Sequence, residues 1–328
     1  SMLFRCKNCG GNTVYSPERG KMYCPHCGGI DSGEAEGAGK RTECVNCGAP
    51  LEIKEYNSTC KCEYCGSYII LDERVEGEYE PHLVLPFQIG MKHAVELLKK
   101  EFKSRVFTPG TFLAESTLEE MKGMYVPFWL YDYKADVDYV GKGTKVRVWT
   151  GGDTEYTETS YYRVGRNMGI DFRKVPVDAS IAMPDDVMDL MEPFDYNVLK
   201  EFQAEYMSGF YGEIYNEGAD ILEERAKRKA ESDADTLLRE TLTGYTSLMP
   251  EHKDIRLNRK EVSYTLLPVW RYIYKYQGKD YPFYVNGQTG KIIGSTPVSK
   301  KKVLAYGGTV FAAVWMALSF LIGIMEIL

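Results

Sequence analysis

The amino-acid sequence predicts an α+β fold with two small N-terminal zinc ribbons, a duplicated β-rich α+β body and one C-terminal transmembrane helix. Three observations lead to this prediction. Four Cys-x-x-Cys pairs form two sets with identical spacing near the N-terminus. The stretches "YVPFWLYDY" and "LLPVWRYIY" repeat one aromatic pattern. The segment "VLAYGGTVFAAVWMALSFLIGIM" contains no charged side chain. A chain of 328 residues has room for two or three such compact units.

The first predicted units are zinc ribbon 1, residues 1–30, and zinc ribbon 2, residues 43–72. Both carry the spacing C-x2-C-x14-C-x2-C, so the second set is a copy of the first. The predicted metal ligands are Cys6, Cys9, Cys24 and Cys27 in ribbon 1, and Cys44, Cys47, Cys62 and Cys65 in ribbon 2. Four thiolates complete the tetrahedral shell of Zn²⁺ and leave no position for a catalytic water. The sequence therefore predicts two structural zinc ions, without which modules this small would not fold.

Two further side chains are weaker candidates for metal ligands. Cys60 could replace Cys62, but the identical loop length in the first set favours Cys62. His26 lies inside "CPHC", yet four thiolates already suffice, and we expect it to be an exposed residue of the turn. Cysteine pairs in a chain without a signal peptide bind metal more often than they form disulfides. This indicates a reducing, cytoplasmic environment.

Residues 31–42 lie between the ribbons and are rich in Gly, Glu and Ser, which predicts a flexible linker. The ribbons would then need no fixed relative orientation. Residues 1–27 carry four Lys/Arg and one acid, whereas residues 43–72 carry two Lys/Arg and five acids. Each tetrathiolate zinc adds about two further negative charges. Because a surface that tracks phosphates needs clustered cations, the head favours protein partners and nucleic-acid binding is not expected.

The α+β body is predicted at residues 79–298. Residues 125–133 and 266–274 share the pattern Pro-x-Trp-x-Tyr-x-Tyr. Aromatic residues that alternate with other residues indicate strands with one packed face. We expect the prolines at strand starts and two related β-rich halves. The aromatic stripes are more typical of a core than of a base-stacking surface. "VNGQTGKIIG" (285–294) lacks the spacing of a phosphate loop and predicts turns between short strands.

Helices are predicted at 91–105 and 218–242. The second has a narrow, alanine-rich stripe made of Leu222, Ala226, Ala230, Ala234, Leu238 and Leu242. Such a face packs closely on its own domain or on another subunit, so a homo-oligomer remains an alternative. The sequence has no HExxH, no G-x-S-x-G and no paired nucleophile and base, and we therefore expect no enzymatic activity.

The last predicted element is a transmembrane helix at 303–325. At 1.5 Å per residue its length is about 35 Å, which exceeds a hydrocarbon core of about 30 Å. Lys300, Lys301 and Lys302 precede it, and the positive-inside rule keeps the preceding domains in the cytoplasm. We expect a tail-anchored, single-pass protein of the cell membrane that contacts membrane lipid.

The chain resembles a family of bacterial membrane proteins with N-terminal TFIIB-type zinc ribbons, which are often mislabelled as primosomal-helicase-like. The resemblance is carried by "CEYCGS" (62–67), "LPF" (85–87), "YVPFWLYDY", "EYMSGFYGEIYN" (205–216) and "VNGQTGKIIGSTP" (285–297). Members of that family include a Bacillus membrane protein encoded beside phage-shock protein A and an SPFH/flotillin-like protein. The resemblance implies a non-enzymatic scaffold that places such partners at the membrane during envelope stress.

The functional hypothesis is a tail-anchored membrane adaptor that recruits cytoplasmic protein partners through its zinc ribbons. One alternative is a membrane-tethered, nucleic-acid-binding regulator, for which salt-dependent binding by the two ribbons would be the discriminating observation. Another is an enzyme whose pocket lies between the two β halves.

Overall fold

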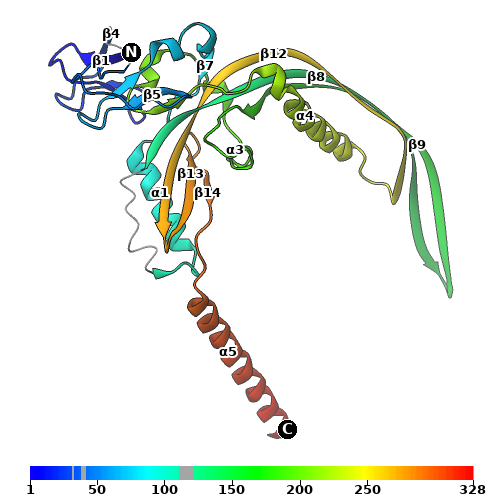
Figure 1. The fold of residues 1–328 in the computed structure, drawn as a ribbon. Coiled ribbons are helices and arrows are strands. Elements are labelled where there is room, and N and C mark those ends of the chain that lie inside the picture. Colours follow the sequence, from blue (N-terminus) through cyan, green and yellow to red (C-terminus); the bar gives the residue numbers. More distant parts are fainter. Residues whose placement is uncertain (32, 38–41, 111–120, 328) are drawn as a thin grey trace. The chain divides into compact units, whose positions relative to one another are not determined.

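The computed structural model of the chain describes residues 1–31, 33–37, 42–110 and 121–327 and has the expected mixed α+β architecture (Figure 1). Its described part divides into two compact units. The first contains Ser1–Tyr15, Lys21–Pro86 and Tyr125–Leu267, and the second contains Ser16–Gly20, Phe87–Met124 and Pro268–Leu328. The first unit therefore includes most of both ribbons and one β-rich half, and the second includes the other half and the C-terminal helix.

The elements follow one another along the chain in this order. The N-terminal third contains β1 (Met2–Cys6), β2 (Val14–Ser16), β3 (Lys21–Tyr23), β4 (Gly33–Gly37), β5 (Asn57–Lys61), β6 (Tyr68–Ile70), β7 (Leu83–Val84) and α1 (Met91–Ser104). The middle contains β8 (Lys122–Gly151), β9 (Thr154–Asp178), α3 (Asp185–Met191), β10 (Lys200–Glu201), β11 (Tyr211–Glu213) and α4 (Ala219–Thr241). The rest contains β12 (Ser247–Tyr276), β13 (Lys279–Asn286), β14 (Ile292–Gly294) and α5 (Lys300–Ile327).

In the first unit one sheet runs through both ribbons and the body, in the strand order β10-β7-β12-β8-β11-β5-β6-β1-β4, and β9 pairs with β8. Strand β1 of ribbon 1 meets β6 of ribbon 2 at the pair Met2–Ile70. On its other edge β1 pairs antiparallel with β4, from Met2–Gly37 to Cys6–Gly33. The two ribbons thus share a sheet and are not the independently oriented modules that the linker composition suggested.

Strand β4 lies within residues 31–42, which the sequence predicted to be a flexible linker. Its residues pair with β1 and satisfy backbone groups that the edge of β1 would otherwise leave to solvent. Composition favoured a linker because glycine and glutamate have low strand propensity, but the ladder overrides that preference. Residues 32 and 38–41 lie outside the described part of the chain.

The long hairpin β8–β9 forms the core of the first unit together with α4. Its ladder runs from Phe128–Asp178 to Gly151–Thr154, with a register shift between Tyr131 and Tyr133. The predicted alanine stripe of α4 packs on this unit, where Ala234 and Leu238 join a core cluster with Val137. The side chains of α4 that are buried are Ala226, Ala230, Ala234 and Leu238. The stripe therefore covers the chain's own sheet.

In the second unit, β12 pairs with β13 from Val269–Asn286 to Tyr276–Lys279, and β13 also pairs with β14. Helix α1, which lies within the predicted helix 91–105, buries Ala94, Leu98 and Phe102. The ring of Phe102 packs edge-on against Phe283 at 4.8 Å. This unit has its own apolar core.

The two β-rich halves repeat the same set of contacts. Trp129 Nε1 donates to the Glu217 carbonyl at 3.0 Å, and Trp270 Nε1 donates to the Ile89 carbonyl at 2.8 Å. Each carbonyl lies shortly before a helix, α4 in one half and α1 in the other. The indole of Trp129 also packs on Tyr215 at 5.0 Å, as Trp270 packs on Phe87 at 5.0 Å. The repeated Pro-x-Trp pattern therefore belongs to a repeated strand-to-helix junction.

The prolines of this pattern lie inside long strands, so the expectation that they begin strands is wrong. Pro268 falls between Leu266, the last residue of β12 paired with β7, and Val269, the first paired with β13. Pro127 directly precedes Phe128, where the β8–β9 ladder begins. At such changes of partner the missing N–H of proline costs no ladder hydrogen bond. Both proline carbonyls still accept, from Ala179 N and from Gly287 N, each at 2.9 Å.

The turn at the end of β9 and the turn at the end of β13 differ in one side chain, which can be ionised in the first and is neutral in the second. In the second half, buried Asn286 Oδ1 accepts hydrogen bonds from Gln288 N at 2.9 Å and Thr289 N at 3.0 Å. In the first half, buried Asp178 Oδ1 accepts from Ser180 N at 3.0 Å. Burial raises the pKa of Asp178 to about 8, and the charge of nearby Asp185 raises it further than Arg225 lowers it. A carboxyl group thus occupies a place where the other half has a neutral amide.

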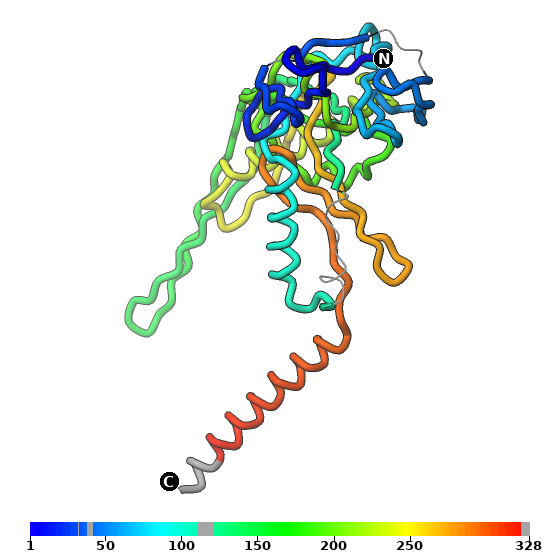
Figure 2. The backbone as a smooth tube through the Cα atoms, turned by 90° about the vertical axis from the view of Figure 1, so that its left-hand side faces the viewer, coloured from blue at the N-terminus to red at the C-terminus, as the bar shows by residue number. Residues whose placement is uncertain are grey.

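Helix α5 forms the C-terminal end of the backbone trace (Figure 2). In the described part of the chain it is the one helix that is long and apolar enough to span a membrane. Its segment Lys300–Ile322 has 23 residues and a mean hydropathy of 1.7. Every side chain of that segment is exposed, and Leu304 and Phe311 are 75% and 69% exposed. By length and composition this helix could cross a bilayer.

Candidate metal centres

Each of the four Cys-x-x-Cys pairs folds into the same tight turn. In the first turn the Cys6 carbonyl accepts from Gly10 N at 2.8 Å, and Cys6 N donates to the Gly11 carbonyl at 2.8 Å. Gly10 has a φ of +72°, which a residue with a side chain rarely adopts. The same hydrogen bonds and positive φ values recur at Gly28, Gly48 and Gly66. The turn directs both sulfurs of a pair toward one point.

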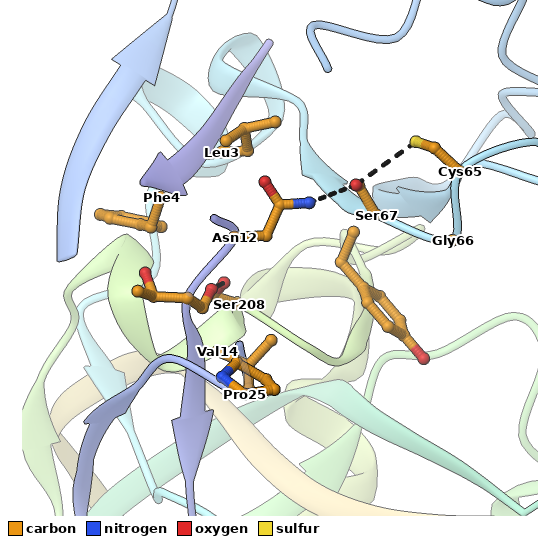
Figure 3. A pocket seen from close by; sticks show the side chains of 11 residues that line it. Leu3, Phe4, Asn12, Val14, Pro25, Cys65, Gly66, Ser67 and Ser208 are labelled. Carbon is orange, nitrogen blue, oxygen red and sulfur yellow. Dashed lines mark hydrogen bonds between the residues drawn. The ribbon is translucent and has the colours of Figure 1, made fainter. Parts of the chain in front are cut away.

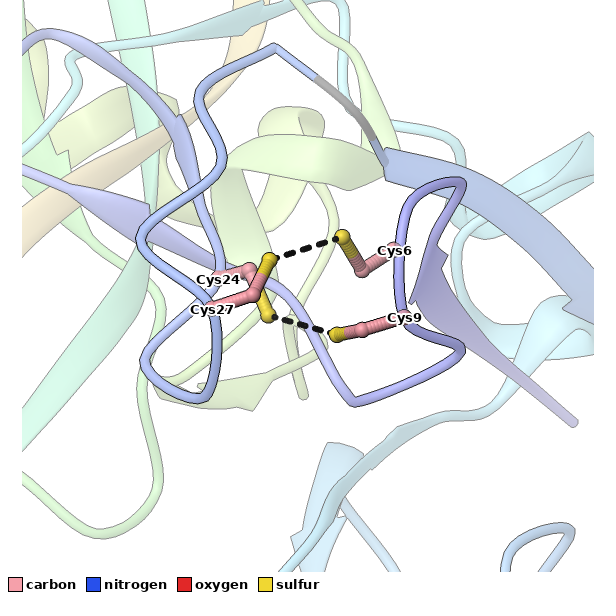
Figure 4. A group of neighbouring side chains, drawn as sticks. All are labelled: Cys6, Cys9, Cys24 and Cys27. Atoms are coloured by element: carbon pink, nitrogen blue, oxygen red, sulfur yellow. Dashed lines mark hydrogen bonds between the residues drawn. The ribbon is translucent and has the colours of Figure 1, made fainter.

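The turns bring the eight predicted ligands together as two groups of four. Figure 4 shows the first group. In the first group, Cys6 Sγ lies 3.6 Å from Cys27 Sγ, and Cys9 Sγ lies 3.6 Å from Cys24 Sγ. In the second group, the corresponding pairs are Cys44–Cys65 at 3.6 Å and Cys47–Cys62 at 3.7 Å. Sulfurs bound to one tetrahedral zinc at about 2.3 Å would lie about 3.8 Å apart, whereas a disulfide bond is about 2.05 Å long. The geometry fits a tetrahedral metal ion.

Burial follows one pattern in both clusters. The first cysteine of each pair is buried, and the second is exposed. A metal ion in either cluster would be held from the protein side and shielded by a turn on the solvent side. With all four sulfurs bound, the shell is complete, so the chemistry that such a site supplies is structural.

Neither of the two weaker ligand candidates belongs to a cluster. Cys60 is 3% exposed and lies in an apolar core together with Ile69 and Leu71. Burial raises the pKa of its thiol, as it also raises the pKa of Cys44, so Cys60 is excluded by position: its sulfur lies outside both groups of four. His26 is exposed on its turn. The same core includes Leu3, so a β1 residue of ribbon 1 helps to fill the interior of ribbon 2.

A hydrogen-bond network also joins the ribbons beside the second cluster (Figure 3). The amides of Asn12 in ribbon 1 and Asn46 in ribbon 2 both donate to Ser67 Oγ, the latter at 3.0 Å. The thiol of Cys65 donates to Ser67 Oγ at 3.3 Å. When Cys65 is a thiolate, the hydroxyl of Ser67 would donate to the sulfur instead. Burial alone would raise the pKa of Cys65, but hydrogen bonds from Ser67 and Asn46 outweigh it and lower the pKa to about 6. These hydrogen bonds favour the thiolate form of Cys65, whereas burial raises the pKa of its neighbour Cys44 to about 12.

The segment 205–216, which contains "SGF", connects the body to both ribbons. Ser208 Oγ donates to the Thr13 carbonyl at 2.7 Å, and the Ser208 carbonyl accepts from Tyr15 N at 3.0 Å. Further along the segment, the Phe210 carbonyl accepts from Thr59 Oγ1 of ribbon 2 at 2.9 Å. Strand β11 then pairs with β5. One short segment of the body thus hydrogen-bonds ribbon 1 through Ser208 and pairs with ribbon 2 through strand β11.

A cavity of about 170 Å³ lies where the ribbons and this segment meet (Figure 3). Its wall includes Phe4 and Pro25 of ribbon 1, Cys65 and Ser67 of ribbon 2, and Ser208 of the body. Residues of ribbon 1, ribbon 2 and the body therefore line one cavity together.

Sequence reasoning found the ligands but missed Asn12, Ser67 and Ser208. Ser67 and Ser208 stand inside stretches that carry the family resemblance, which was a usable signal for both. No sequence pattern pointed to Asn12, because its hydrogen-bond partner Ser67 lies 55 residues away in the chain.

Comparison with known proteins identifies one relative along nearly the full length of the chain. The chain is 34% identical over 326 residues to a protein of Bacillus subtilis (strain 168) called "Uncharacterized protein YdjG", and the match covers 96% of each chain. No protein-family model matches the chain. No solved structure matches it significantly.

Proposed function

We propose a function for this chain, which belongs to the family of the Bacillus subtilis protein YdjG. It acts as a non-enzymatic membrane adaptor whose zinc ribbons recruit cytoplasmic proteins to the bilayer. The observation that carries the proposal is the combination, in one chain, of two closed four-cysteine clusters and one exposed apolar helix of membrane-spanning length. The clusters stabilise small binding modules, and the helix anchors them.

Zinc is the metal that best suits these clusters. Four thiolates at tetrahedral spacing, on turns of the Cys-x-x-Cys type, are typical of structural zinc sites. A ribbon of about 25 residues buries too little apolar surface to fold alone, so the metal supplies most of its stability. Such an ion leaves no coordination position open, which favours a binding role over catalysis.

The head offers an extended surface because the ribbons share a sheet, a core and a hydrogen-bond network. On ribbon 2, the turn that contains Cys62 and Cys65 also exposes Tyr64, whose exposed fraction is 74%. Tyrosine is enriched in protein interfaces because it supplies a large contact area at low entropic cost. The surrounding ribbon carries five acids and two Lys/Arg between residues 43 and 72, so it suits a partner with basic groups.

The orientation follows from Lys300, Lys301 and Lys302 at the start of α5, which favour a cytoplasmic location for the ribbons and the body. The resemblance to TFIIB-type zinc-ribbon membrane proteins suggests SPFH/flotillin-like and phage-shock-type proteins as the first partners to test. Recruitment of such proteins would connect the chain to envelope stress.

The proposal is tested by crosslinking and pull-down from membranes that contain the full chain. The double variant Cys44→Ser, Cys47→Ser removes two ligands of the second cluster and unfolds ribbon 2 while it leaves α5 in place. Tyr64→Ala keeps the metal and removes one exposed side chain. We expect both variants to remain in the membrane and to lose most of the captured partner.

Cys60→Ala is the matched control, because it removes a ribbon 2 sulfur that lies outside the cluster. This variant should keep both zinc ions and the partner. If the double variant lacks one zinc ion and still captures every partner as the wild type does, the ribbons do not recruit and the proposal is wrong.

A further inference from the structure

The second unit contains an open cavity where helix α5 begins. Its volume is about 810 Å³. Its walls come from three places: the tip of the β12–β13 hairpin, the connection that leads into α5, and residues 109–110 after α1. The residues that carry the argument are Tyr276, Gln277, Lys279, Tyr281, Lys300 and Lys301. The cavity is thus built by the residues that enter the membrane-spanning segment and by a hairpin that returns to them.

Three ammonium groups line this cavity, and no acid is among its described lining residues. Lys279, Lys300 and Lys301 are exposed, and none of them forms an ion pair with another described residue. Two neighbouring lysines, Lys275 and Lys302, are not among the residues that line the cavity. Lys302 Nζ donates to the Thr108 carbonyl at 2.7 Å, and Lys275 lies directly opposite Asp280 in the β12–β13 ladder. Lys279, Lys300 and Lys301 thus place three positive charges in the wall of the cavity.

The framework around the cavity is fixed by hydrogen bonds within the second unit. Ser299 N donates to the Phe107 carbonyl at 2.8 Å, and the hydroxyls of Thr108 and Thr296 lie 2.8 Å apart. Arg105 donates to the Gly294 carbonyl at 2.9 Å. These bonds join the loop after α1 to the connection into α5. Three lysines on such a framework form a defined site, in contrast to a flexible basic tail.

Apolar surface continues directly from the cavity along α5. Val303 and Leu304, which follow the lysines, are 43% and 75% exposed, and Val298 beside them is 65% exposed. Half-buried Tyr276 and Tyr281 add amphipathic rings to the wall, and tyrosine favours the level of lipid headgroups. A ligand that fits all of these features has a negative headgroup joined to hydrocarbon chains.

We propose that this cavity binds the phosphate-bearing headgroup of an anionic phospholipid, held by Lys279, Lys300 and Lys301, while the acyl chains lie along the first turns of α5. Juxtamembrane lysines attract anionic lipids in general. The specific prediction is that Lys279, which belongs to strand β13 and not to the basic start of the helix, contributes to binding while Lys275 on the same hairpin does not.

The proposal rests on the membrane anchoring argued above, so its test must separate the two. The full chain is reconstituted in nanodiscs of phosphatidylcholine and phosphatidylglycerol, and lipids that stay bound after release are identified by native mass spectrometry. Wild type should retain phosphatidylglycerol in preference to phosphatidylcholine. Lys279→Gln should lower that preference by about fivefold, and Lys275→Gln, which makes the same change of charge, should leave it almost unchanged.

Three outcomes would overturn the lipid site. They are an unchanged preference in Lys279→Gln, an equal loss in Lys275→Gln, and displacement of phosphatidylglycerol by excess inorganic phosphate, which would assign the cavity to a free anion. Extraction of wild-type membranes with carbonate distinguishes these three outcomes from a failure of α5 to anchor the protein in the membrane. Protein that stays in the membrane without lipid preference disproves the site alone, and protein that appears in the wash disproves the anchoring as well.

Discussion

The amide of Asn12 in ribbon 1 donates a hydrogen bond to Ser67 in ribbon 2, and Ser67 Oγ lies 3.3 Å from Sγ of the ligand Cys65. One ribbon therefore supports the four-cysteine cluster of the other. Outer residues of this kind orient ligands and tune their protonation, and their loss typically lowers metal affinity about 10- to 100-fold. The two clusters should not be independent.

We expect Asn12→Ala to weaken metal binding in ribbon 2 although the substitution lies in ribbon 1. The hydroxyl of Ser67 would lose one of its two amide donors and hold the Cys65 thiolate less firmly. The affinity of one of the two sites should fall by about tenfold in a chelator competition. Asn8→Ala provides the control, since Asn8 is an exposed residue of the first turn. Equal effects of both substitutions would show that the contact between ribbons does not matter.

The buried carboxyl of Asp178 should make stability depend on pH. The pKa is about 8 in the folded chain and about 3.9 in an unfolded one. Between these values the unfolded chain releases a proton that the folded chain retains, so stability falls as pH rises from about 4 to about 8. The loss is at most about 1.4 kcal/mol per pH unit. Thermal unfolding of detergent-solubilised protein at several pH values measures it.

Asp178→Asn should remove this pH dependence and raise the unfolding temperature at pH 8, because an amide occupies the equivalent turn in the other half. Asn286→Asp is the reverse experiment and should introduce a similar penalty, since Asn286 is fully buried. If Asp178→Asn lowers stability at pH 8, the carboxylate is stabilised by its surroundings, and the inferred rise in pKa is wrong.

Gly209 should be required for the attachment of ribbon 1 to the body. Its φ is +94°, and a Cβ at this position would lie 3.0 Å from Val14 Cβ. Gly209→Ala therefore adds a steric contact to backbone strain of about 1 kcal/mol. We expect faster proteolysis and faster hydrogen exchange in residues 1–30. Gly244→Ala separates the two effects, because Gly244 has a φ of +88° with open space around it. Similar behaviour of both variants would mean that the contact with Val14 contributes nothing.

Local patterns in the sequence predicted the elements whose structure is decided locally. The cysteine spacing predicted the turns that carry the cysteines, and the uncharged run predicted helix α5. The alanine stripe predicted the buried face of α4. The position of Pro127 and Pro268 within long strands was not predictable, because it depends on which neighbour each strand pairs with at that point. The repeated Trp junction was visible as a pattern, but its partners Glu217 and Ile89 were not.

The features that escaped prediction are contacts between residues distant in sequence. Strand β4 forms because β1 offers it an edge, and the glycine and glutamate composition of that segment gives no sign of pairing. Ser208 contacts Thr13 across 195 residues through one hydroxyl, which no periodicity reveals. The independence of the ribbons was inferred from composition alone and was wrong for this reason.

The central claim is that two metal ions, each held by four cysteines, stabilise a head that the C-terminal helix anchors in a membrane. The most direct test is the zinc content of full-length protein purified from membranes that have been washed with carbonate. The account predicts two zinc ions per chain in the membrane-retained protein. Retained protein with no bound zinc, or protein released into the wash, would contradict it.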